Sequence, residues 1–287
     1  MTLIVVLLLL LIFLTFIVFI SHKMTRPERS VGDWDPGDLD IEYEEVSFIT
    51  EDGVNIKGWW MDKDSHKTLI CLHGYTASRW YDVYMKPLLD ILKDEPYNLI
   101  FIDLRAHGVS GGDRCTFSDK EYLDLEASMD WLEKNHPKGC EKIGVVGYSM
   151  GAMVAIKGLA SDERIDCSVA DSPPMNPDST FSRSLKYFTG LPPFLYHFIK
   201  PVSRLLYGIK HPDMYDFSDR IDKPLLLIGG KNDPIIEVDE IRSFYEINKQ
   251  KNDEVTLWIT EAEHVRSIRS TPKEYKKRIV SFLKRYM

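Results

Sequence analysis

Short apolar runs alternate with longer segments of helical periodicity from about residue 43 to the C-terminus. Each run has four or five residues and no charged side chain, which is typical of parallel strands buried on both faces. The alternation predicts an α/β fold, in which helices cover both faces of a mostly parallel sheet. The runs are Thr68–Leu72, Leu99–Ile102, Ile143–Val146, Cys167–Ala170, Leu225–Ile228 and Val255–Ile259.

The start of this region has a different pattern. Two β-rich segments, Tyr43–Thr50 and Val54–Met61, are joined by Glu51-Asp52-Gly53, a sequence that favours a tight turn. Such a short connection cannot join parallel strands. We therefore expect an antiparallel hairpin at the edge of the sheet.

Two helix starts carry capping signals. Ser118 with Glu121 has the spacing of a capping box, in which the hydroxyl and the carboxylate each accept a backbone N–H group. Thr271 with Glu274 repeats the spacing, and Pro272 suits the first position of a helix. Ser118 and Thr271 are thus expected to be N-cap residues.

Residues 175–223 are too many for a simple connection between strands, and long insertions in compact domains are usually functional. Their periodicity predicts a helical cap of two amphipathic helices separated by Gly190–Pro193. Such a lid would line an acyl pocket; alternatively, its apolar stripes only pack against the sheet. The apolar stripes are Phe181, Leu185 and Phe188 in one helix and Leu195, Phe198, Ile199, Val202, Leu205 and Leu206 in the other.

Residues 1–21 have the composition of a membrane-spanning helix. From Leu3 to Ile20 every side chain except Thr15 is strongly apolar, and at ~1.5 Å per residue the run covers roughly 27 Å of hydrocarbon. A cleaved signal peptide is the alternative. No Lys or Arg precedes the run and no small-residue cleavage site follows it, which favours a retained single-pass transmembrane anchor.

The residues after this run predict a tether and an orientation. Lys23, Arg26 and Arg29 follow directly, and the positive-inside rule then places the catalytic domain on the cytoplasmic side. Proline, glycine and charged residues across residues 22–42 are typical of a linker to the folded domain, residues 43–287.

Charge and cysteine content exclude several function classes. The net charge of -8 leaves no strongly basic face for a nucleic acid. The four cysteines, Cys71, Cys115, Cys140 and Cys167, lie too far apart for a disulfide scaffold or a zinc site. We therefore expect no nucleic-acid partner and no metal.

The chain contains a G-x-S-x-G motif, Gly147-Tyr148-Ser149-Met150-Gly151, directly after the apolar run Ile143–Val146 and before the helical segment Ala152–Leu159. A serine at such a strand-to-helix turn is exposed for nucleophilic attack, and the flanking glycines avoid collisions with the neighbouring strand and helix. The helix N-terminus also points free N–H groups at the oxyanion of acyl transfer. Ser149 is therefore the candidate nucleophile.

A serine nucleophile needs a histidine base and a carboxylate that orients the histidine. In this architecture the acid and the histidine follow the serine, each in a loop after a later strand. Asp233 follows Leu225–Ile228, and His264 follows Val255–Ile259. These two residues are the candidates, with Asp171 as the alternative acid. Glu261 and Glu263 are expected to be solvated neighbours.

The loop after Leu72 should complete an oxyanion hole. Its sequence is His73-Gly74-Tyr75, and the N–H group of Tyr75 would act together with that of Met150. The His73 ring is expected to brace this loop. The glycine-rich segment Asp103–Gly112 lacks the lysine and the spacing of a phosphate-binding loop, so we interpret it as structural.

Together these motifs resemble the α/β-hydrolase superfamily, in particular its small prokaryotic membrane-anchored esterases and lysophospholipase-like hydrolases. The resemblance covers about residues 43–287. It implies an α/β-hydrolase fold with an eight-stranded sheet and one antiparallel strand, no cofactor, and hydrolysis through an acyl-enzyme. The chain lacks the H-G-G-G oxyanion loop of another esterase group. The matching elements are His73-Gly74-Tyr75, Asp103–Ser110, Gly147–Gly151, Asp233 and His264.

The sequence thus predicts a serine esterase of the carboxylesterase or lipase type that cleaves carboxylic esters with an apolar acyl group. Ser149 would attack the carbonyl, His264 would transfer the proton, and Asp233 would orient His264. A peptidase, thioesterase or acyltransferase with the same triad stays open, and so does a non-catalytic binding protein of this fold. The anchor makes lipid-like esters and the membrane the expected partners, and the oligomeric state is left open.

Overall fold

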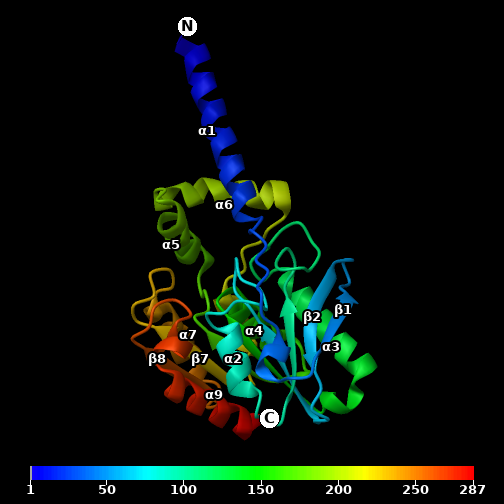
Figure 1. The fold of residues 1–287 in the computed structure, drawn as a ribbon. Coiled ribbons are helices and arrows are strands. Elements are labelled where there is room, and N and C mark those ends of the chain that lie inside the picture. Colours follow the sequence, from blue (N-terminus) through cyan, green and yellow to red (C-terminus); the bar gives the residue numbers. More distant parts are fainter. Residues whose placement is uncertain (1) are drawn as a thin grey trace.

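The computed structural model describes residues 2–287, in which an eight-stranded sheet lies between layers of helices (Figure 1). The strand order is β1-β2-β4-β3-β5-β6-β7-β8; β2 pairs antiparallel with both of its neighbours, and the remaining pairs are parallel. The α/β prediction and the antiparallel hairpin β1–β2 at the edge are confirmed. The strands are β1 Glu44–Ile49, β2 Asn55–Met61, β3 Lys67–Leu72, β4 Asn98–Asp103, β5 Lys142–Tyr148, β6 Ile165–Asp171, β7 Leu225–Gly230 and β8 Val255–Thr260.

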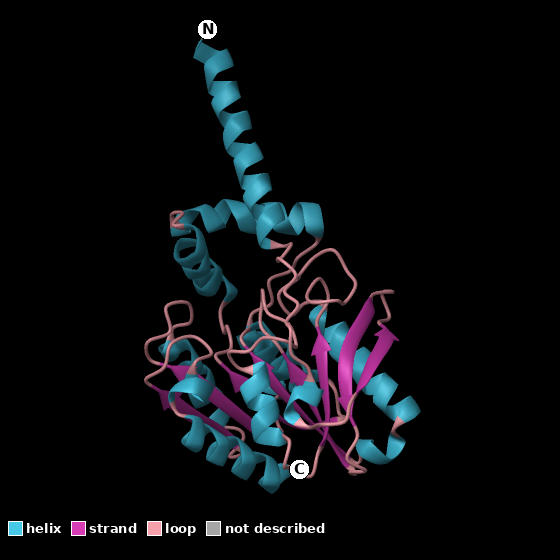
Figure 2. Cartoon of the chain, in the orientation of Figure 1, coloured by secondary structure: helices cyan, strands magenta, loops and turns pink. Residues whose placement is uncertain are grey.

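The sheet separates two hydrophobic cores, because alternate side chains of a strand point to opposite faces. In β3, Ile70 and Leu72 belong to one core, whereas Leu69 and Cys71 belong to the other. Figure 2 shows the helices on both sides of the magenta strands. The first core includes residues of α3 Glu121–Asn135, α4 Met150–Ser161 and α7 Val238–Lys249, and the second includes residues of α2 Met85–Leu92, α8 Ser267–Ser270 and α9 Pro272–Tyr286.

The two predicted N-caps do not form as expected. Helix α3 begins at Glu121, whose carboxylate accepts the N–H of Ser118 at 2.8 Å, but the Ser118 hydroxyl has no partner among residues 2–287. Only half of the capping box is present. Helix α9 begins at Pro272 as predicted, yet the Thr271 hydroxyl donates to the carbonyl of Ser267 at 3.0 Å. The short helix α8, which the sequence analysis missed, supplies that carbonyl.

Two helices lie between β6 and β7, as the periodicity of residues 175–223 predicts. They are α5 Pro177–Thr189 and α6 Tyr196–Tyr207. The 3₁₀ turn η3 Pro193–Leu195 directly precedes α6. Phe181 and Leu185 are buried, but several side chains of the predicted stripes face outward. The remaining 3₁₀ segments are η1 Pro36–Leu39, η2 Pro137–Cys140 and η4 Met214–Arg220.

The chain begins with the long helix α1 Thr2–Met24, which projects from the molecule above α6 (Figure 1). Its mean hydropathy of 3.6 over an 18-residue window and its length are sufficient to cross a membrane.

The following residues are not a free linker, although their composition predicts a tether across 22–42. The Arg29 guanidinium donates to the carbonyls of Gly108 at 3.2 Å and Gly112 at 2.8 Å. Trp34 is buried, and its indole N–H donates to the carbonyl of Trp80 at 2.6 Å. This segment is therefore packed against the domain.

Candidate functional site

Ser149 lies at the sharp turn between β5 and α4, with φ 51° and ψ −114°. A non-glycine residue in this region is strained by about 1–3 kcal/mol. The flanking glycines make the turn feasible. A Cβ atom on Gly147 would lie 2.1 Å from the carbonyl oxygen of Gly151, and one on Gly151 would lie 2.5 Å from that of Leu72. The turn thus requires glycine on both sides, as the motif predicts.

Ser149, His264 and Asp233 are joined by hydrogen bonds, although they lie after three different strands. His264 Nε2 is 2.9 Å from Ser149 Oγ, and His264 Nδ1 is 2.6 Å from Asp233 Oδ2. The other carboxylate oxygen of Asp233 accepts the N–H groups of Ile235 and Ile236, each at 2.8 Å. These bonds fix the carboxylate toward the imidazole. The three candidates from the sequence are therefore brought together.

The alternative acid, Asp171, has other partners. Its carboxylate accepts hydrogen bonds from Tyr275 Oη at 2.8 Å and Ser172 Oγ at 2.9 Å. Burial raises the pKa of Asp171 to about 6. Its backbone carbonyl accepts the Ser149 N–H at 2.8 Å, but its carboxylate makes no hydrogen bond to His264. The geometry thus favours Asp233 as the partner of His264.

Other carboxylates near His264 face solvent. Glu261 and Glu263 are both exposed, and Glu261 pairs with Lys231. Both are solvated neighbours, as expected.

The loop after β3 lies against the serine turn. A Cβ atom on Gly74 would be 3.2 Å from that of Ser149, so the next residue, Tyr75, is close to the nucleophile. Met150 is the first residue of α4, where a helical N–H has no intrahelical acceptor. The placement of both residues is compatible with the predicted oxyanion hole.

The His73 ring braces this loop, as expected from the sequence. Its Nε2 accepts the N–H of Leu104 at 2.9 Å, and its Nδ1 lies 2.7 Å from the carbonyl oxygen of Gly74. Burial holds the pKa of His73 well below its usual range, so the ring is neutral. A neutral ring that accepts at Nε2 and donates at Nδ1 satisfies both contacts.

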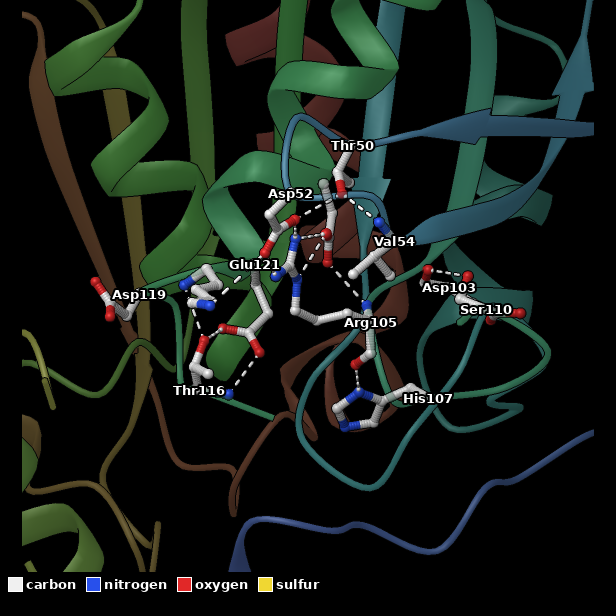
Figure 3. Close-up of polar contacts among 12 residues, drawn as sticks. Thr50, Asp52, Val54, Asp103, Arg105, His107, Ser110, Thr116, Asp119 and Glu121 are labelled. Atoms are coloured by element: carbon white, nitrogen blue, oxygen red, sulfur yellow. Dashed lines mark hydrogen bonds and ion pairs between the residues drawn. The ribbon is translucent and has the colours of Figure 1, made fainter. Parts of the chain in front are cut away.

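Residues of the segment Asp103–Gly112 form a network of hydrogen bonds and ion pairs that has a structural role (Figure 3). The buried Arg105 guanidinium binds Asp52 at 2.7 Å and Asp124 at 2.7 Å. Ser110 Oγ donates to the carbonyl of Asp103 at 2.5 Å, and His107 Nδ1 lies 2.8 Å from that of Arg105. Two carboxylates already neutralise the arginine, so it offers no cation to a phosphate.

A cavity of about 630 Å³ opens beside Ser149 and His264. Lys23 and Met24 at the end of α1 and Glu28 in the segment that follows also line it. The sequence analysis missed this contribution, because no local pattern relates residues 23–28 to a loop fifty positions later. Among residues 2–287 no group of three or more His, Cys, Asp and Glu side chains is placed to hold a metal ion. The apolar walls of the cavity include Tyr75, Phe117, Met153, Phe181, Leu185 and Phe188.

Comparison with known proteins gives the family. The model of the alpha/beta hydrolase family matches residues 69–246, and the chain belongs to this family. The esterase Pf2001 of Pyrococcus furiosus is similar in structure, with 49% identity, a TM-score of 0.83, and coverage of 92% of this chain and 99% of that one. The Bacillus subtilis protein YqkD is 30% identical over 254 residues, which cover 84% of this chain and 80% of YqkD.

A more distant structure shares the fold alone. The acylaminoacyl peptidase of Pyrococcus horikoshii has 17% identity and a TM-score of 0.64, over 89% of this chain and 44% of the peptidase.

Proposed function

We propose that the protein is a serine hydrolase of carboxylic esters, with Ser149, His264 and Asp233 as its catalytic triad. The observation that carries the proposal is the row of hydrogen bonds from Ser149 through His264 to Asp233, at a strained turn beside an apolar cavity. The similarity to the esterase Pf2001 at 49% identity over nearly all of that protein supports an ester as the substrate.

In this proposal the reaction proceeds through an acyl-enzyme. Ser149 Oγ attacks the ester carbonyl while His264 Nε2 takes its proton, and Asp233 stabilises the imidazolium. The N–H groups of Tyr75 and Met150 hold the developing oxyanion. His264 then protonates the leaving alcohol. A water molecule, activated by His264, attacks the acyl-enzyme and releases the acid and the free serine.

The cavity walls support an apolar acyl group. Phe117, Phe181 and Phe188 contribute aromatic surface and Leu185 aliphatic surface, and each buried methylene group of a ligand contributes ~0.8 kcal/mol. Because Phe181 and Leu185 belong to α5, residues 175–223 act as a lid over the catalytic domain, residues 43–287. We expect activity to rise with acyl length until the cavity is full.

Helix α1 is proposed to anchor this enzyme in a membrane as a single transmembrane span. Its 23 residues exceed the ~20 that cross a bilayer. Lys23 and Arg26 at its end favour a cytoplasmic catalytic domain. The neighbouring bilayer then favours lipid-like esters as substrates.

Turnover of p-nitrophenyl esters of increasing acyl length tests the function, using the full-length protein in detergent micelles. Ser149→Ala should abolish turnover and labelling by a fluorophosphonate probe. Ser184→Ala, which changes another serine of the cavity, is the matched control and should retain both. Serine-specific labelling without turnover of any ester would refute ester hydrolysis and favour a peptide or thioester substrate.

A further inference from the structure

The helices between β6 and β7 carry several large apolar side chains that are exposed in the described residues 2–287. We name this group the outer cap face. Leu205 is 83% exposed and Phe188 is 63% exposed, although both are strongly apolar. The residues of this face belong to the neighbouring elements α5, η3 and α6, and exposed apolar clusters usually bind a partner. The outer cap face consists of Tyr187, Phe188, Phe194, Phe198, Leu205 and Leu206.

Helix α6 is apolar on two opposite sides. Tyr196, Ile199 and Ser203 are buried against the protein. Phe198 and Leu205, seven residues apart and therefore on one helical face, point away from that side. A helix that covers a pocket requires only the first of these faces. Except where Phe198 contacts α1, the second face is exposed and could contact an apolar phase outside the protein.

The outer cap face is continuous with α1. The rings of Phe13 and Phe198 meet edge to face with centroids 5.3 Å apart, and Ile17 is only 1% exposed. Figure 1 shows α6 crossing the lower part of α1. The contact joins the cap to the middle of the apolar run of α1, and not to its C-terminal end.

The length of the apolar run fixes the depth of this contact. From Leu3 to Ile20 the run covers roughly 27 Å, which is barely the ~30 Å of a hydrocarbon core. The whole run is therefore needed for a span. Phe13 lies seven residues before Ile20, about 10 Å inside the hydrocarbon at ~1.5 Å per residue. Its contact places Phe198 within the membrane boundary.

The helical part of the cap, residues 179–212, is basic, although Arg183, Lys200 and Lys210 pair with Glu237, Asp178 and Asp119. From Ser179 to Pro212 the chain has five Lys and Arg residues and no Asp or Glu, although the whole chain carries a net charge of -8. Interfacial helices combine an apolar face with basic side chains that reach the headgroups. Arg204 on α6 is exposed beside the outer cap face.

We propose that the outer cap face rests in the lipid bilayer and that the enzyme takes its ester substrate directly from the membrane. This inference rests on the proposed ester hydrolysis and on α1 as a span. The cavity at Ser149 is lined by Phe188 of the outer cap face and by Lys23 and Met24 of α1. It thus lies directly below the bilayer, and an acyl chain reaches it without crossing water. The substrate class is a membrane-resident ester with a long acyl chain.

Quenching by lipid tests the placement of the face. Full-length protein with Cys140→Ser, which removes the part-exposed cysteine, is labelled with a fluorophore at Leu205→Cys or, as a control, at Lys277→Cys on α9. The vesicles contain phosphatidylcholine and phosphatidylglycerol with a spin label on the acyl chain. We expect quenching at position 205 and none at 277. If the spin-labelled lipid does not quench the fluorophore at position 205, the proposal is overturned. Quenching that arises only from contact between two labelled copies would also overturn it, because the face would then bind a second copy of the chain.

Comparing hydrolysis of an ester in solution with hydrolysis of an ester in vesicles tests whether the substrate enters from the membrane. The variant Phe194→Glu with Leu205→Glu alters only the outer cap face, since neither residue lines the cavity. It should hydrolyse a soluble short-chain ester as fast as the unmodified protein, but a long-chain ester in the same vesicles on the order of ten-fold more slowly, or about 1.4 kcal/mol. Ile247→Glu on α7 adds a matched charge at another exposed apolar residue and should change neither rate.

The two assays separate this inference from the proposed function. Equal hydrolysis of the vesicle ester by the double variant and the unmodified protein would overturn membrane access, while Ser149-dependent turnover of the soluble ester persists. If Ser149→Ala leaves turnover of the soluble ester intact, the proposed function itself fails.

Discussion

The hydroxyl group of Tyr75 donates a hydrogen bond to the carbonyl oxygen of Met24, 2.8 Å away. Met24 is the last residue of α1, and Tyr75 lies in the loop proposed to contribute an oxyanion donor. The bond joins the end of the proposed anchor to the loop beside Ser149. The N-terminal helix therefore contacts the site in addition to its proposed role as a membrane anchor.

Tyr75→Phe removes this bond and keeps the backbone N–H of residue 75. We expect kcat/KM for a long-chain ester to fall by a factor of about five, the equivalent of one hydrogen bond of ~1 kcal/mol. Steady-state kinetics of the full-length protein provide the measurement. Tyr81→Phe, which removes a hydroxyl from another tyrosine of the cavity, is the control. An equal loss in both variants would argue against the coupling.

Asp233→Asn and Asp171→Asn distinguish the two carboxylates. An amide at position 233 donates to His264 Nδ1 and so favours the wrong tautomer, which should lower kcat on the order of 10⁴-fold. Asp171→Asn alters a buried acceptor of Tyr275 and Ser172, and is expected to lower stability by about 1–3 kcal/mol while kcat stays within ~10-fold. The reverse ranking of the two kcat values would make Asp171 the acid.

Two glycine substitutions test the geometry of the serine turn. Gly151→Ala would bring a Cβ atom to 2.5 Å and 2.6 Å from the carbonyl oxygens of Leu72 and His73. These are backbone atoms of the end of β3 and of the loop that follows it, and they cannot move aside independently. We expect a loss of turnover on the order of 100-fold, as for loss of an oxyanion donor, or failure to fold.

Gly190→Ala is the matched control. Gly190 has a φ of 71°, and a Cβ atom there would meet nothing within 4 Å. The expected cost is therefore only the ~1 kcal/mol of a left-handed conformation. Measuring esterase turnover and thermal unfolding of both variants provides the comparison, and wild-type turnover in Gly151→Ala would contradict the close approach.

The sequence predicts those features that depend on local pattern. The uncharged runs around Ile143 and Leu225 correspond to buried strands β5 and β7, since a strand covered on both faces has no solvent side. The G-x-S-x-G motif locates the turn at Ser149, because close backbone approach requires glycine. Chain order and strand ends then point to His264 and favour Asp233, but they leave Asp171 as an alternative acid, and only the hydrogen bonds of the structure distinguish the two carboxylates.

Features that depend on remote partners could not be predicted. Arg29 binds backbone carbonyls of the loop at Gly108 and Gly112. Because every residue has a backbone carbonyl, the sequence does not indicate which carbonyls Arg29 binds. The composition around Arg29 therefore resembles a linker although the segment is packed. Likewise, Ser118 has the spacing of an N-cap, but its carboxylate partner Glu121 also accepts the N–H of Thr116 at 2.7 Å and starts the helix itself.

His211 fixes the cap from within. Its Nδ1 lies 3.1 Å from Tyr196 Oη and its Nε2 lies 2.7 Å from Ser203 Oγ, so it connects two residues of α6 to the segment that follows. The residue is only 6% exposed. Burial, with a smaller effect of the Lys200 charge, lowers the pKa of His211 to about 4 from its ordinary 6.5.

This lowered pKa makes the stability of the cap depend on pH. Between the ordinary pKa of 6.5 and the folded value of about 4, the unfolded chain binds the proton more readily than the folded chain. Stability is therefore fully present above pH ~6.5 and falls as the pH decreases toward ~4, by on the order of 3 kcal/mol. His211→Gln removes the titration and keeps a side chain that donates and accepts. Chemical denaturation of both proteins in the same detergent should show the stability of the unmodified protein falling relative to His211→Gln from pH 7 to pH 4, and a constant difference over that range would exclude His211 as the titrating group.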